Sequence, residues 1–249
     1  MKGIVFNGKH SFTDFGLVMI SKNRPILPEP KLAFEELPGC DGEYDYSGFN
    51  PDGRIKYKAI VFEVEFAFRQ ISMADVRTKA HAIAAWLSCG DRQLSFDDDP
   101  NKYWIGKVVN KLDLENLLTS VRRFTVQFKC SPFAYSTQVF NQEFVINGPT
   151  DIAINNLGTY VRPIIDIEGS FTNIVFSANG KTLTYNAAII DAVLEIDFEQ
   201  MIAVKDGAIN VNNNLFGSFL ELVSGSNTLQ ISGTDLNCTA TISFRYVYL

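Results

Sequence analysis

Alternating apolar and polar residues mark the clearest strand of the chain. In the segment Val61–Phe68, every even position is Phe or Val, and Glu63 and Glu65 stand between them. Successive side chains of a strand point to opposite faces, so this period of two predicts a strand with one buried face. Lys56 and Lys58 continue the even positions upstream. The strand is therefore expected to begin outside the core.

A helix is predicted after this strand. Ser72 and Asp75 have the spacing of an N-terminal capping box, and Gly90 stands where a C-terminal glycine is expected. The opposite face carries small residues, which either admit a neighbouring surface closely or simply face solvent: Thr78, Ala82 and Ala85. Apolar residues recur at helical spacing on the core side: Met73, Val76, Ala80, Ile83, Ala84 and Leu87.

The first 50 residues are expected to be irregular. Four prolines exclude a helix or a central strand there, and acidic and aromatic residues are interspersed among glycines. A loop of this length in a compact domain is typical of a functional or partner-bound segment. The alternative, a mobile surface loop, stays open.

The rest of the first half reads as further strands. Leu94 and Phe96 lead into the turn Asp97–Pro100, and the segments 103–109 and 123–129 are predicted strands. No strong period survives between Ser131 and Pro149, so the domain junction is expected there. This gives an N-terminal domain 1–136 and a C-terminal domain 137–249.

The second half is predicted to be all β. Asn179-Gly180 and Asp206-Gly207 are strong hairpin signals, and many short strands at this spacing favour a β-sandwich. The predicted strands are 161–168, 173–177, 181–185, 192–199, 202–205, 208–211, 219–223, 228–231 and 239–248. The fold class is therefore mainly β in two domains, with a single helix in the first.

Composition and charge support two domains and exclude some classes. The chain has 249 residues, 46% of them hydrophobic, and a net charge of −6, which disfavours a basic nucleic-acid binder. Residues 1–135 carry 18 basic and 17 acidic side chains, whereas residues 136–249 carry 4 and 11. Such a break in charge is typical of two domains with different surroundings. No signal peptide or membrane-spanning segment is expected.

No catalytic constellation is found in the sequence. His10 and His81 are the only histidines, and neither lies in a metal-binding or nucleophile motif. The four cysteines have no zinc or redox spacing and are expected to be reduced, structural thiols. We therefore expect no catalytic residues, no cofactor and no enzymatic activity.

Two carboxylate clusters are weighed as metal sites and rejected. Asp97–Asp99 are interrupted by Pro100, and Glu195, Asp197 and Glu199 alternate on a strand. Alternate strand residues lie about 6.6 Å apart, too far for three of them to share one calcium ion. A polar outer face is the better interpretation, and no metal is expected. Carbohydrate binding by the second domain stays possible, although both tryptophans lie in the first half.

Several segments of the chain, taken in order, form a recognisable set of motifs. The chain opens with Phe6–Leu17 (FNGKHSFTDFGL), and a proline-rich acidic loop, a long strand and a single capped helix follow. The second half contains Ile196–Phe198 and the pattern F-x-x-L-x-x-G-x-N-x-L-x-I-x-G over Phe219–Gly233. These motifs and their order resemble the distal tail protein (Dit) family of long-tailed phages with non-contractile tails.

This resemblance implies a structural role. It implies an N-terminal domain akin to tail-tube proteins that builds a hexameric ring, and a C-terminal sandwich similar to galectins and carbohydrate-binding modules. The ring would join the tail tube protein and tape-measure protein to the tail-associated tip protein, and DNA would pass without specific binding. The location would be the tip of the virion tail, after assembly in the host cytoplasm, with no membrane contact. Thr78, Ala82 and Ala85, with the loop Pro28–Asn50, are the candidate ring interfaces. The alternative is a soluble carbohydrate-binding β-sandwich protein.

Overall fold

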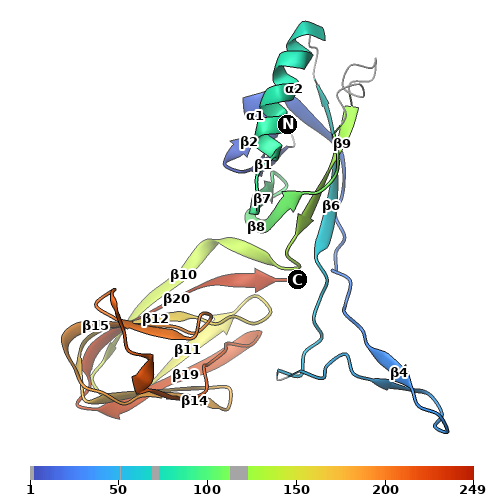
Figure 1. Cartoon of the computed structure of the whole chain (residues 1–249). Coiled ribbons are helices and arrows are strands. Elements are labelled where there is room, and N and C mark those ends of the chain that lie inside the picture. Colours follow the sequence, from blue (N-terminus) through green and yellow to red (C-terminus); the bar gives the residue numbers. More distant parts are fainter. Residues whose placement is uncertain (1–2, 51, 69–72, 113–122) are drawn as a thin grey trace. The chain divides into compact units, whose positions relative to one another are not determined.

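The computed structural model describes residues 3–50, 52–68, 73–112 and 123–249, and strands dominate it (Figure 1). Two compact units make up the chain. Unit 1 is Met1–Ala134 together with Leu249, and unit 2 is Tyr135–Tyr248. The mainly β fold class predicted from the sequence is confirmed.

Unit 1 combines an antiparallel sheet with two helices. Pairing joins seven of its strands in the order β2-β1-β7-β8-β9-β6-β3, and β4 pairs with β5 separately. The elements are β1 (Ile4–Phe6), β2 (Lys9–His10), α1 (Ser11–Phe15), β3 (Leu17–Asn23), β4 (Phe34–Glu36), β5 (Glu43–Asp45), β6 (Ile60–Phe68), α2 (Met73–Leu87), β7 (Arg92–Phe96), β8 (Asp99–Val108) and β9 (Arg123–Cys130).

The core of unit 1 lies between this sheet and α2 (Figure 1). Phe62 stands opposite Phe128, and Val64 stands opposite Val126, so the apolar faces of β6 and β9 coincide. Trp86 of α2 stacks on Phe15 and donates a hydrogen bond of 2.7 Å to the carbonyl of Phe6. The period of two that predicted β6 is therefore the period of burial.

Four expectations for unit 1 are corrected by the structure. The first 50 residues are not irregular throughout, because β1, β2, α1 and β3 lie within residues 4–23. Unit 1 has two helices where the sequence predicted a single one, because the short helix α1 was not expected. Gly90 does not adopt a left-handed conformation, and Ala84 of the predicted core stripe is exposed. The predicted N-cap Ser72 lies outside the described residues, as do the side chains of Met73 and Val76.

Unit 2 is a sandwich of two antiparallel sheets. One sheet has the order β17-β16-β15-β12-β20-β10 and the other β11-β19-β13-β14-β18. The elements are β10 (Ala134–Ile146), β11 (Thr150–Asn156), β12 (Ile164–Phe171), β13 (Asn173–Ala178), β14 (Lys181–Tyr185), β15 (Ile189–Asp197), β16 (Ile202–Lys205), β17 (Ile209–Asn210), a 3₁₀ turn (Asn212–Asn214), β18 (Leu215–Gly217), β19 (Gly225–Thr234) and β20 (Asn237–Tyr248).

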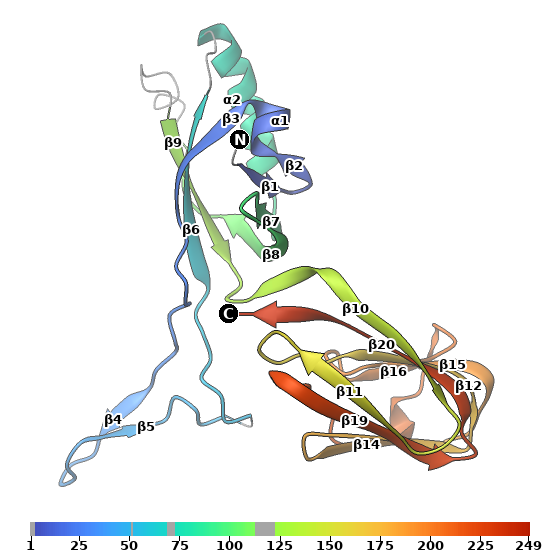
Figure 2. The ribbon, with the colours of Figure 1, turned by 180° about the vertical axis from the view of Figure 1, so that it is seen from behind.

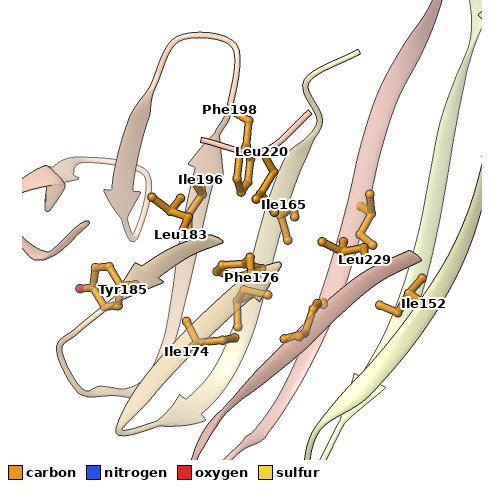
Figure 3. Close-up of a cluster of buried hydrophobic side chains, with 14 of the residues drawn as sticks. Ile152, Ile165, Ile174, Phe176, Leu183, Tyr185, Ile196, Phe198, Leu220 and Leu229 are labelled. Atoms are coloured by element: carbon orange, nitrogen blue, oxygen red, sulfur yellow. The ribbon is translucent and has the colours of Figure 1, made fainter. Parts of the chain in front are cut away.

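The core of unit 2 fills the space between its two sheets (Figure 3). Ile165 and Ile196 come from one sheet, Phe176 and Leu229 come from the other, and all four are fully buried. The hairpin signal Asn179-Gly180 is confirmed, because both residues have positive φ between β13 and β14. Such turns match the twist of paired strands.

Two expectations for unit 2 are also corrected. The segment between Ser131 and Pro149, in which the sequence shows no strong period and no strand was predicted, contains the 13-residue strand β10. The segment 219–223 is not a strand, and its Leu222 forms only an isolated bridge with Val161. Leu220 and Leu222 are nonetheless fully buried, so an apolar run marked burial here and not strand pairing.

Candidate interaction surfaces

The three carboxylates of the acidic turn Asp97–Asp99 have four partners between them. The carboxylate of Asp97 accepts hydrogen bonds from the backbone of Gly3 at 2.6 Å and from His10 Nε2 at 3.1 Å. Asp98 pairs with Lys22, whose hydrogen bond lowers the pKa of Asp98. Asp99 lies 3.9 Å from Lys102. Each of the three carboxylates thus contacts partners of its own, and these contacts hold the turn in place.

The carboxylates Glu195, Asp197 and Glu199, which lie in β15 and just after its end, also have different partners. Asp197 is buried and accepts hydrogen bonds from the backbone of Glu199 and Gln200, both at 2.8 Å. Glu199 lies 3.7 Å from Arg162. Glu195 stands opposite Asp166 in the strand pairing. Burial, and then the charge of Glu195, raises the pKa of Asp166. No cluster of three metal-ligating side chains exists among the described residues.

His10 and the buried cysteines have structural roles in the fold. His10 is the N-cap of α1: its Nδ1 accepts from the backbone N–H groups of Phe12 and Thr13, while Nε2 faces Asp97. The four cysteines form no disulfide, and two of them are buried. Burial raises the pKa of the Cys130 thiol to about 12, which leaves it a poor nucleophile.

A long two-stranded arm is the most exposed part of unit 1. It runs out from β3 and returns to β6, and β4 and β5 form its tip (Figure 2). Backbone hydrogen bonds hold it extended, including Lys58 N–H to Glu29 O at 2.8 Å and Lys31 N–H to Lys56 O at 2.7 Å. Between residues 29 and 59 no described residue is buried. This span contains most of the loop Pro28–Asn50, for which the sequence allowed either a functional segment or a mobile surface loop.

The arm exposes apolar and acidic side chains together. Phe49 is 88% exposed, and Phe34, Tyr44 and Leu32 are exposed as well. From Phe34 to Asp45 the chain has five carboxylates and no lysine or arginine. Exposed apolar groups rimmed by polar ones are typical of surfaces that bind a protein partner.

A cavity of about 280 Å³ lies at the base of the arm. Its lining includes Arg24, Ile60, Phe62, Lys102, Trp104 and Pro132. The guanidinium of Arg24 lies 5.2 Å from the ring centre of Phe96 and 5.5 Å from that of Trp104. Its Nη1 is buried and has no hydrogen-bond partner among the described residues. Sequence reasoning missed this site, because separate segments of the chain build it and none of them carries a local signal.

The small-residue face predicted for α2 lies on the surface. Thr78, Ala82 and Ala85 are all exposed, on the side of α2 away from buried Ile83 and Trp86. The structure therefore places this face of α2 on the surface of the described part of unit 1.

The outer face of β6 and β9 is polar and carries balanced charge. Gln127 donates to Glu63 at 2.8 Å, and Arg123 lies 3.7 Å from Glu65. Lys129 is exposed on the same face. No helix among the described residues is long and apolar enough to cross a membrane.

The motif residues of the second half support backbone turns. Asn227 is 3% exposed, and its amide bonds to the backbone of Val223 at 2.9 and 2.8 Å and to Gly225 O at 2.9 Å. Asn179 donates to the same amide oxygen at 2.8 Å. The Asn of the signature thus holds the buried segment before β19 in place.

Comparison with known proteins agrees with this architecture. Residues 11–130 match the family described as phage tail protein RIFT-related domain. The whole fold is similar to the crystal structure of the Dit protein (gp 19.1) of phage SPP1, with a TM-score of 0.76 and 15% identity over 99% of both chains. No curated protein matches the sequence. The resemblance to distal tail proteins indicated by the motifs is confirmed by the family profile over 11–130 and by the fold over the whole length.

Proposed function

We propose that this chain is a structural distal tail protein: six copies form a ring at the tip of a phage tail, and DNA passes through it. The main support is the phage tail domain at residues 11–130 within a chain that has the Dit fold from end to end. The SPP1 protein is described as a paradigm of the hub of the adsorption apparatus in phages that infect Gram-positive bacteria. The same place in the virion is proposed here, reached by assembly in the host cytoplasm.

The size of unit 1 fits a ring of six. A domain of 134 residues has a radius of gyration of about 14 Å, and hence a diameter of about 36 Å if it is spherical. Six touching spheres leave a hole of one diameter, about 36 Å, whereas four leave about 15 Å. A DNA duplex is about 20 Å across. Six copies therefore pass DNA, and three or four do not.

The polar face of β6 and β9 suits the lining of such a channel. Its acidic residues Glu63 and Glu65 are balanced by Arg123 and Lys129, so the surface has little net charge. A strongly basic channel would bind the DNA phosphates and slow their passage. The DNA is proposed to slide without specific contacts.

Ring closure needs two different patches on each copy, because head-to-tail contacts are heterologous. The exposed arm is proposed as one patch, and the α2 face of Thr78, Ala82 and Ala85 as the other. Unit 1 is proposed to form the ring, with unit 2 outside it. The tail tube, tape-measure and tail-associated tip proteins are the proposed neighbours along the tail axis, and no catalytic activity is proposed.

Electron microscopy of the assembled tail tip tests this proposal. The expected result is a ring with six-fold symmetry at this protein, with unit 1 around a hole wide enough for DNA. A different symmetry, or a channel lined by unit 2, would contradict it. A monomer in dilute solution is compatible with the proposal, since the tail tube can template the ring.

One observation favours the alternative function of carbohydrate binding. An open cavity of about 350 Å³ lies on the outer face of the β11-β19-β13-β14 sheet, lined by Asp151, Gln230, Ser177 and Thr182 among others. Carboxylate, amide and hydroxyl groups are the partners that sugar hydroxyls need. A glycan array with the full chain, and with Gln230→Ala as the control, tests this alternative. Binding that the substitution abolishes would support it.

A further inference from the structure

The strand β10 is a long edge strand that lacks the usual protection of an edge. Among the strands of unit 2 it forms one end of its sheet, and it runs along the rim of that unit (Figure 2). The edge strands β17 and β18 have two and three residues, whereas β10 has 13. Proteins commonly protect an edge against pairing with another chain by a short strand, a lysine or a proline. No lysine or arginine occurs from Cys130 to Val161, and β10 contains no proline.

The part of β10 that lies well inside unit 2 is exposed on its outer face. None of the side chains from Gln138 to Val145 is buried. Val139 is 47% exposed and Val145 is 69% exposed. On the other face, Phe140 and Phe144 pack in part against the core of unit 2. Core contacts therefore hold this strand in place, while its outer face presents apolar side chains to solvent.

The sequence of this segment is nearly a palindrome. Residues 139–145 read V-F-N-Q-E-F-V, with Gln142 at the centre. If two copies of the strand pair antiparallel about Gln142, the residues that face one another match in chemistry: Val139 with Val145, Phe140 with Phe144, and Asn141 with Glu143. Directly opposite side chains are the pairs that stabilise a sheet, and an amide can donate a hydrogen bond to a carboxylate.

Other registers match less well. A pair centred on Glu143 would place two carboxylates directly opposite one another, which is destabilising. A pair centred on Asn141 would place Val139 opposite Glu143. The register about Gln142 therefore combines apolar pairs with the absence of directly opposed like charges.

We propose that β10 of one copy pairs antiparallel with β10 of a second copy about Gln142, so that the two sheets become one continuous sheet. The same patch is used on both copies, so this contact differs in kind from the head-to-tail contacts of the proposed ring and does not depend on them. One strand pair is smaller than a standard protein interface. The pairing is therefore weak in dilute solution and strengthens where copies are concentrated.

Disulfide trapping tests the register. Directly opposite Cα atoms of antiparallel strands lie about 4.5–5.5 Å apart, within the range that a disulfide spans. Gln142→Cys should therefore form a covalent dimer under mild oxidation. Gln138→Cys is the matched control, because it is the same change at an exposed position of the same strand, but its two copies would lie about 27 Å apart. Both are made with Cys40→Ser, since Cys40 is an exposed thiol. On non-reducing gels, we expect Gln142→Cys to dimerise at least tenfold faster.

Charge changes test the pairing of Asn141 with Glu143. With Gln142→Cys as the reporter, Asn141→Lys places a lysine opposite Glu143 in two symmetry-related pairs and should speed trapping about three- to tenfold. Asn141→Lys/Glu143→Lys places lysine opposite lysine and should trap more slowly than the reporter alone. A general effect of net charge would instead make this double variant the fastest. Asn213→Lys, the same change at an exposed turn of unit 2, is the control and should leave the rate unchanged.

Three results would overturn the inference. Trapping of Gln138→Cys as fast as that of Gln142→Cys would contradict the register. Faster trapping of the double-lysine variant would attribute the association to net charge. No dimer of Gln142→Cys, in concentrated protein and in isolated tails, would mean that β10 does not pair with itself. Each result leaves the proposed ring standing, because the ring uses other surfaces.

Discussion

Replacing Asn227 by Ala should destabilise unit 2 and leave unit 1 unaffected. The buried side chain takes part in four hydrogen bonds: two with the backbone of Val223, one with Gly225 O and one with Asn179. Each contributes about 1 kcal/mol net, and the sum is not additive, because the substitution also strands the partners. We expect a loss of about 2–4 kcal/mol, near the upper end of single-residue effects. For a unit of this size, that lowers the melting temperature by about 8–17 °C.

The two tryptophans make the assay selective. Trp86 and Trp104 both lie in unit 1, so tryptophan fluorescence follows that unit, while calorimetry records both units. Asn227→Ala should move the calorimetric transition of unit 2 and leave the fluorescence transition in place. Asn227→Asp keeps an acceptor for Val223 N–H and should lose less. The control Asn213→Ala, the same change at an exposed position of unit 2, should stay within about 0.5 kcal/mol of the wild type.

Two results would refute this reasoning. A loss below about 1 kcal/mol for Asn227→Ala would mean that water replaces the lost bonds and that Asn227 is not a structural support. An equal shift of the tryptophan transition would mean that the two units unfold together, against the separable domains expected from the sequence.

Three further predictions concern His10, Asp166 and the thiols. His10→Ala removes the acceptor for two α1 N–H groups and should cost about 1 kcal/mol in the tryptophan-monitored transition, whereas His10→Asn should restore part of it. Because the pKa of Asp166 is raised in the folded state, the contribution of Asp166 to stability is fully present below its unfolded pKa and is lost as the pH rises through its folded pKa. Asp166→Asn should remove that decline, by less than about 1 kcal/mol because solvent screens the site, and urea titrations at pH 3 to 8 measure it. A thiol reagent should label exposed Cys40 at once and Cys130 only on unfolding; fast labelling of Cys130 would contradict its burial.

Strands with one buried face were easier to predict from the sequence than exposed ones, although β11 was missed even though Ile152 and Ile154 are buried on one of its faces. The strand 202–205 was located correctly, and its Ala203 is fully buried. The strand β10 was missed, because from residue 137 to residue 145 none of its side chains is buried. A period of two exists only where one face meets a core, so an exposed strand leaves no such pattern. The strand predicted at 219–223 was wrong for the opposite reason. This segment is a buried loop, so its apolar residues reflect burial and not pairing with another strand.

The candidate surfaces also differ in whether a local sequence pattern indicates them. Prolines and mixed acidic and aromatic residues marked the arm before its structure was known, and the small face of α2 followed from helical spacing. The cavity of Arg24 could not be predicted, because Arg24, Ile60, Trp104 and Pro132 meet only through the fold. Tertiary packing brings the residues of such a cavity together, and no local sequence pattern predicts it.

The motif residues that resemble distal tail proteins make contacts that stabilise the fold of their own chain. His10 caps α1, Asn227 holds a buried loop, and Gly233 has a φ of +156°, where a Cβ would clash with the carbonyl oxygen of Asn173. Each of these positions is constrained by contacts within its own chain. The arm tip has no such internal constraint, since none of its side chains is buried. Its composition is therefore free to match whatever surface the neighbour presents, and chains with the same motifs but different arm tips should assemble only with their own kind.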